Sequence, residues 1–241
     1  MGGRRRWRRV AGFSVVMSWP ESPYSSGPPP SPASNPRAWA AGCAGAALVL
    51  GGLSIIGFAI ASQVHAPQPA ASAAGRTSEA GLGPSLSRSL PVTVDIPAIG
   101  VHSQLLHLGR NSDGTIEVPS LTTAADEAAW YEYSATPGQI GTSVIEGHVD
   151  SYQGPAVFFR LGALKPGDDI NITLANGVTA IFRVTGVREY LKDNFPDQLI
   201  YGDTHYAALR LITCGGVFDT ATGHYLSSTV VFASLTSSRR G

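Results

Sequence analysis

Leu209-Arg210-Leu211-Ile212-Thr213-Cys214-Gly215-Gly216 has the two-residue alternation of a β-strand and closes with two glycines. The glycine pair predicts that the strand ends there, where the backbone needs conformational freedom or another group approaches closely. A cysteine at this position would be held rigidly at one end of a sheet, where a nucleophile could act. The alternative interpretation is a buried cysteine that contributes only to packing.

Short strands separated by turn residues continue through the rest of the C-terminal region. An Asn-Gly pair at Asn176 and Gly177 predicts a tight hairpin. One or two helical turns are expected at residues 156–161, and no segment repeats at a fixed period. Many short strands with little helix predict an all-β fold in the form of a closed or nearly closed barrel. Strands are expected at residues 92–96, 101–108, 115–119, 129–131, 142–147, 170–174, 179–187, 209–214 and 225–234.

Charge is distributed unevenly along this chain of 241 residues, although its formal net charge is zero. Residues 1–37 contain six arginines and one glutamate, whereas residues 88–241 contain ten lysines and arginines and fifteen aspartates and glutamates. An acidic globular part argues against nucleic acid as a partner, because phosphates are bound by clustered lysine and arginine. The basic N-terminal part is assigned to targeting.

Composition divides the chain into four segments. Residues 1–37 are basic and rich in Pro, Ser and Gly, which predicts a disordered cytoplasmic segment. Residues 38–62 contain a long uncharged apolar run, which predicts a single transmembrane anchor. Residues 63–90 are mostly Ala, Ser, Pro and Gly and predict a linker, and residues 91–236 form the folded domain. Because the arginines precede the apolar run, the N-terminus is expected in the cytoplasm and the domain outside the cell.

Cys214 and His148 are the candidate catalytic residues. Cys214 is the only cysteine outside the apolar run, so one chain offers it no disulfide partner in the domain. His148 follows another predicted strand and is also adjacent to a glycine. An imidazole beside a thiol can accept its proton and later protonate a leaving amine. No metal is predicted, because the histidines and Cys214 lack ligand spacing such as CxxC or HxxxH, and no cofactor is predicted.

Several stretches of the domain resemble the sortases, the cysteine transpeptidases of Gram-positive cell surfaces. Within that family the chain is most similar to the actinobacterial class F group. A Gly-His-x-Asp motif that precedes a Thr-Cys pair makes the resemblance specific, and it covers about residues 90–235. It implies a closed eight-stranded β-barrel with short helices, here preceded by one transmembrane helix. The matching stretches are residues 91–97, 146–151, 213–219, 223–225 and 230–233.

The resemblance also implies an activity and its partners. Cys214 would attack the Thr–Gly bond of an LPXTG-like sorting signal to form a thioacyl enzyme, with His148 as general acid and base. An amine of a peptidoglycan precursor or of a pilin would then accept the protein. The enzyme would act at the cell membrane as a single-pass protein with its catalytic domain outside.

One element of the family pattern is missing. Sortases use an arginine, usually on the last strand, to bind substrate and stabilise the oxyanion, but no arginine lies between Gly215 and Ser238. Arg210 is four residues from Cys214, or about 13 Å along a strand. His224 is a candidate for the third residue, but it lacks a permanent charge at neutral pH.

Two alternative functions stay open. The first is a cysteine peptidase that only hydrolyses. Papain-like and NlpC/P60-type peptidases place the cysteine before the histidine, however, and L,D-transpeptidases place it in a Ser-His-Gly-Cys context that is absent here. The second is an inactive, anchored sortase-like domain that binds cell-wall peptides. Residues that bind the substrate are not identified from the sequence.

Overall fold

The computed structural model describes residues 65–77 and 84–240. The predicted cytoplasmic segment and transmembrane anchor lie outside these residues. Within the described ranges, no helix is long and apolar enough to cross a membrane.

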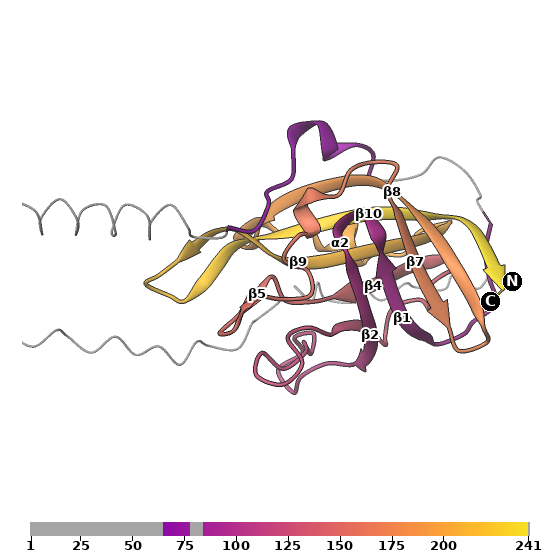
Figure 1. Cartoon of the computed structure of the whole chain (residues 1–241), viewed down its shortest axis with the longest axis horizontal. Helices are drawn as coiled ribbons and strands as arrows, with labels where there is room; N and C mark the ends of the chain where they lie inside the picture. The colour runs from indigo at the N-terminus through magenta and orange to yellow at the C-terminus, as the bar shows by residue number, and fades with distance from the viewer. Residues whose placement is uncertain (1–64, 78–83, 241) are drawn as a thin grey trace, which may run out of the picture. The chain divides into compact units, whose positions relative to one another are not determined.

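Eight strands form a closed barrel, in the order β1-β2-β3-β4-β9-β10-β8-β7 (Figure 1). The predicted all-β barrel is therefore confirmed, together with its number of strands. Most neighbours are antiparallel, but β2 pairs with β3 and β4 pairs with β9 in parallel. The barrel strands are β1 (Pro91–Ile96), β2 (Val101–Leu108), β3 (Ala128–Tyr131), β4 (Gly141–Glu146), β7 (Asp169–Leu174), β8 (Val178–Leu191), β9 (Ala207–Asp219) and β10 (His224–Arg240).

The remaining elements are short and lie between barrel strands or before the first one. Strands β5 and β6 form a small separate hairpin after β4. The α-helix α2 lies in the connection between β8 and β9. These elements are β5 (Asp150–Ser151), β6 (Gly154–Pro155), α2 (Asp197–Tyr201) and the 3-10 helices η1 (Ala71–Ala74), η2 (Pro97–Ile99), η3 (Leu161–Ala163) and η4 (Lys192–Asn194).

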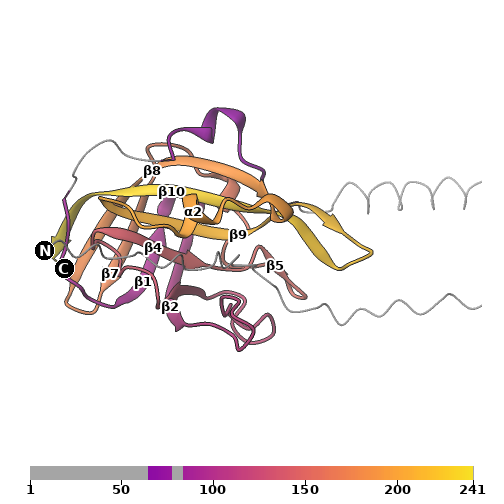
Figure 2. The same cartoon turned by 180° about the vertical axis from the view of Figure 1, so that it is seen from behind.

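The structure confirms the predicted hairpin but changes two of the predicted strands. The hairpin at Asn176 and Gly177 is present between β7 and β8, and Gly177 has a φ of 79°. Residues 115–119 form only an isolated bridge between Ile116 and Arg110, not a strand. Strand β9 does not end at its glycine pair but continues to Asp219, because β10 pairs with it beyond the glycines. The resulting β9–β10 hairpin projects beyond the rest of the barrel (Figure 2).

Two apolar clusters lie on opposite faces of the strands. Side chains from all eight strands form the barrel core, which includes Leu211 of β9. A smaller outer cluster contains Ile212 of β9, Ile200 of α2 and Ile116 of the β2–β3 connection. Since successive side chains of a strand point to opposite faces, Ile212 and Cys214 both point outward, toward the surface that α2 covers.

Residues 71–77 pack along the outside of β8, where η1 lies over the barrel (Figure 1). Ala73 is buried, and the Arg76 amide donates to the Thr185 carbonyl at 2.8 Å. The Arg188 guanidinium also donates to the carbonyls of Ala74 and Gly75, at 3.0 and 3.1 Å. Part of the stretch predicted as a linker is thus fixed to the barrel by one backbone hydrogen bond and two from the Arg188 side chain.

Candidate active site

Cys214 lies on the outer face of β9 and is only 7% exposed. Its direct neighbour on β10 is Ser228, which also pairs with Tyr190 on β8. The thiol belongs to neither apolar cluster, although Ile212, two residues earlier on the same face, is part of the outer cluster. Burial alone fits a structural cysteine, so the polar groups around the thiol decide what it can do.

The two glycines after Cys214 have separate physical causes. A Cβ on Gly215 would lie 2.5 Å from the Thr229 hydroxyl, so this position requires close approach to β10. Gly216 has a φ of 74°, a left-handed conformation that glycine adopts without strain. The sequence offered both explanations, and each applies to one of the glycines. They form an irregularity within β9 and do not end it.

His148 follows the end of β4, the parallel neighbour of β9. The last ladder pair is Glu146 with Ile212, and the Gly147 amide then donates to the Ile212 carbonyl at 3.1 Å. His148 and Cys214 each lie two residues beyond that last pair. Neighbouring strands are about 4.8 Å apart, so this register brings the two positions to the same end of the β4–β9 pair.

The glycine before His148 allows a close contact that orients this region. A Cβ on Gly147 would lie 2.6 Å from Val157 and 2.7 Å from Phe158. The imidazole Nε2 lies 2.6 Å from the Pro119 carbonyl, and the backbone carbonyl of His148 accepts from the Phe158 amide at 2.9 Å. These contacts fix the ring. The catalytic role of His148 with Cys214 stays a prediction.

Burial shifts the pKa values of the Cys214 thiol and the His148 imidazole in the directions that favour their neutral forms. The pKa of the Cys214 thiol rises to about 11, mainly because burial disfavours the thiolate. The pKa of His148 is lowered, also mainly by burial, although the Pro119 contact and the charge of Asp150 oppose this shift. At neutral pH the site therefore holds a thiol and a neutral imidazole, so the ring can accept a proton.

Lys192 is the positively charged residue that is observed in contact with the Cys214 thiol. Its ammonium group donates to Cys214 Sγ at 3.4 Å and partly offsets the increase in the thiol pKa. Sequence reasoning did not identify this residue. It lies in η4, 22 positions before Cys214, and only the pairing of β8, β10 and β9 brings it there.

The other candidates for a positively charged partner lie elsewhere. Arg210 is buried and stacks on Phe232, with its guanidinium carbon 4.6 Å from the ring centroid. His224 begins β10 and pairs with Asp219, five residues after Cys214, which corresponds to roughly 16 Å along an extended strand. Neither arrangement supplies a charge at the thiol.

Two further polar pairs surround the site. The Tyr225 hydroxyl donates to the Asp150 carboxylate at 2.5 Å and joins the β5–β6 hairpin to β10. Glu146 is 1% exposed, accepts from the Tyr201 hydroxyl at 3.4 Å, and has a pKa raised by burial to about 8. Both acidic groups act on Cys214 and raise its pKa. The sequence displayed these residues but gave no sign of their proximity.

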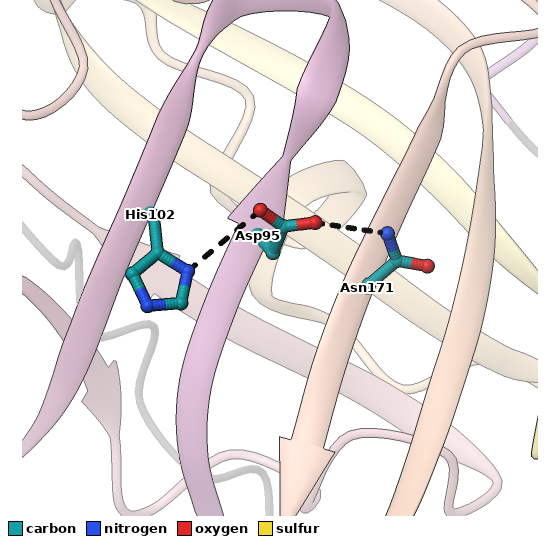
Figure 3. A network of polar contacts seen from close by, with 3 residues as sticks. All are labelled: Asp95, His102 and Asn171. Atoms are coloured by element: carbon teal, nitrogen blue, oxygen red, sulfur yellow. Dashed lines mark hydrogen bonds and ion pairs between the residues drawn. The ribbon is translucent and has the colours of Figure 1, made fainter. Parts of the chain in front are cut away.

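A separate polar group lies on β1, β2 and β7 (Figure 3). Asp95 lies 3.7 Å from the exposed His102 ring and accepts from the Asn171 amide at 3.3 Å. These side chains link three neighbouring strands. In the parts of the chain that the structure describes, no group of three or more His, Cys, Asp or Glu side chains could hold a metal ion.

The chain is similar to several sortases of known structure. Sortase A of Listeria monocytogenes is 17% identical over 64% of this chain and 90% of its own, with a TM-score of 0.47. Sortase A of Corynebacterium diphtheriae is 22% identical over 63% of this chain and 62% of its own, with a TM-score of 0.46. Sortase C1 of Streptococcus agalactiae is 23% identical over 61% of this chain and 67% of its own, with a TM-score of 0.45. A search of curated proteins found no match.

The family model provides the assignment. The model for the sortase domain matches residues 94–236, which is more than half of the 241-residue chain and includes all of β2 to β9. His148 and Cys214 both lie within the match. This chain belongs to the sortase domain family.

Proposed function

We propose that this protein is a cell-surface cysteine transpeptidase in which Cys214 is the nucleophile and His148 the general acid and base. The observation that carries the proposal is the common register of the two residues: each lies two positions beyond the last β4–β9 ladder pair. Membership of the sortase domain family supports a transpeptidase of this type. Resemblance to the class F group is part of the proposal.

The proposed reaction begins with the neutral thiol and imidazole. His148 takes the proton from Sγ as the sulfur attacks the carbonyl carbon of the threonine in an LPXTG-like signal. The C–N bond then breaks, and His148 returns the proton to the leaving amine, which gives a thioacyl enzyme. An amine of a peptidoglycan precursor or pilin attacks the thioester, loses its proton to His148, and releases Cys214.

A capture assay tests this reaction. The full-length chain would be incubated in detergent with an LPXTG-type peptide, with and without a small primary amine, and the products identified by mass. We expect a thioacyl adduct on Cys214 and an amide product that requires the amine. Product formation by Cys214→Ala, or the hydrolysed peptide as the sole product at saturating amine, would contradict the proposal.

A binding domain without activity is the second candidate. It is favoured by the low exposure of Cys214 and by its thiol pKa of about 11, which leaves little thiolate at neutral pH. On that hypothesis the chain would bind a sorting peptide with equal affinity before and after Cys214→Ala, and no thioacyl adduct would form. The capture assay with a labelled peptide separates the two candidates.

We also propose that residues 38–62 anchor the protein in the cell membrane with the catalytic domain outside. The proposal rests on the uncharged run that follows the N-terminal arginines. Protease added to intact protoplasts should release a fragment that contains the barrel. A barrel that is degraded only after lysis would show the opposite orientation.

A further inference from the structure

Lys192 lies against the thiol in an environment that otherwise disfavours negative charge. Its ammonium group is 3.4 Å from Cys214 Sγ. Cys214 is nearly inaccessible to solvent, and the carboxyl groups of Asp150 and Glu146 both act against its ionisation. Among the charged groups that act on the thiol, Lys192 is the one that favours the thiolate.

The fold explains how a residue of the β8–β9 connection reaches β9. Strand β10 lies between β8 and β9, and its Ser228 pairs with Tyr190 on one side and Cys214 on the other. Lys192 follows Tyr190 by two residues, at the point where β8 ends and η4 begins. Because Ser228, the position between Tyr190 and Cys214 on the outer face of β10, is small and buried, the lysine side chain can cross β10 to the sulfur.

We propose that Lys192 is a catalytic residue that supplies the positive charge for the Cys214 chemistry, an inference that rests on the proposed transpeptidase function. As the sulfur loses its proton to His148, the ammonium group stabilises the negative charge on sulfur. The oxygen of the tetrahedral intermediate is separated from Sγ only by the attacked carbon. A donor in contact with sulfur is therefore within reach of the oxyanion as well.

This arrangement accounts for the absence of an arginine from the part of β10 near Cys214. The interval between Gly215 and Ser238 contains none, and Ser228 is the β10 residue opposite Cys214. The charge comes instead from the neighbouring strand end. A lysine ammonium is a compact charge with three donors, so a single group can contact both the sulfur and the adjacent oxygen.

Thiol alkylation tests the inference without any sorting substrate. A full-length chain with Cys43→Ser leaves Cys214 as its only cysteine. In that background we would measure, as a function of pH, the rate at which iodoacetamide alkylates Cys214. The parent chain would be compared with its Lys192→Met and Lys192→Arg variants. Lys165→Met is the matched control, because Lys165 is exposed and is the only other lysine in the chain.

We expect Lys192→Met to lower the alkylation rate at pH 8 about tenfold and to raise the apparent thiol pKa by about one unit. Lys192→Arg should retain most of the rate, and Lys165→Met should match the parent chain. The other charged or titratable groups around the thiol are those of His148, Asp150, Glu146 and Tyr225, and all four residues are kept in every variant. An unchanged rate would overturn the inference, and a faster rate would show that Lys192 merely shields the thiol from solvent.

Peptide capture by the same variants separates this inference from the proposed function. If the parent forms a thioacyl adduct and Lys192→Met forms it equally fast, Lys192 has no catalytic role while the transpeptidase function stands. If the parent forms no adduct, the transpeptidase proposal and the catalytic role of Lys192 both fail. A tenfold loss of alkylation in that case would still show that Lys192 stabilises the thiolate. Thermal unfolding of each variant checks that the fold is retained.

Discussion

Glu146→Gln should remove the loss of barrel stability that ionisation of Glu146 causes between about pH 5 and 8. Glu146 is buried beneath α2, and its Oε2 atom has no hydrogen-bond partner among the residues that the structure describes. Burial raises the pKa of this carboxyl from 4.5 to about 8, an increase that the Tyr201 hydrogen bond only partly opposes. The folded protein therefore favours the protonated form, and a glutamine would mimic it.

The size of the effect follows from linkage between protonation and folding. A carboxyl whose folded-state pKa is raised contributes its full stability below the unfolded pKa. That contribution is lost as the pH rises from 4.5 to about 8. Each unit of difference corresponds to about 1.4 kcal/mol, so the total loss is on the order of 5 kcal/mol. Glutamine carries no charge at any of these pH values and should avoid the loss, while its amide oxygen can still accept from Tyr201.

Urea unfolding at pH 5, 7 and 9 measures this difference. We expect the two proteins to be similar at pH 5 and Glu146→Gln to be more stable by several kcal/mol at pH 9. Glu132→Gln is the control, because Glu132 is exposed and its replacement removes the same charge. Parallel stability curves for the parent and Glu146→Gln would show that Glu146 ionises as readily in the folded barrel as in the unfolded chain.

Three substitutions near the site give further expectations. Cys214→Ala should abolish thioacyl capture and cost about 1 kcal/mol or less, seen as a melting temperature within a few degrees of the parent. A larger fall would indicate that the cysteine is needed for packing. Gly216→Ala should lower the free energy of unfolding in urea by about 1 to 3 kcal/mol, because it combines a φ of 74° with a Cβ 2.7 Å from polar side-chain atoms. Gly177→Ala has a similar φ but open space around the Cβ, so an equal loss there would contradict the steric argument. Tyr225→Phe should lower the free energy of unfolding by about 1 kcal/mol, because it removes the hydrogen bond to Asp150. A double-mutant cycle with Asp150→Asn that shows no coupling would refute this.

The strand pattern could be predicted because local side-chain alternation and turn residues determine it. The hairpin at Gly177 and the length of β2 follow directly from such signals. The predicted end of β9 was wrong because a glycine pair looks the same in the sequence whether it ends a strand or lies within an irregular hairpin. Only pairing with Tyr225 and neighbouring residues of β10 extends β9 beyond Gly216.

The sequence by itself determined the strand pattern and the two residues, His148 and Cys214, whose chemistry suits a cysteine transpeptidase. It did so because alternation, glycine placement and residue type are local properties of the chain. The surroundings of the thiol depend on which strands are neighbours. Lys192 reaches Cys214 across β10, and burial of Glu146 beneath α2 changes its protonation, so only the tertiary structure decided the charges that act on the sulfur.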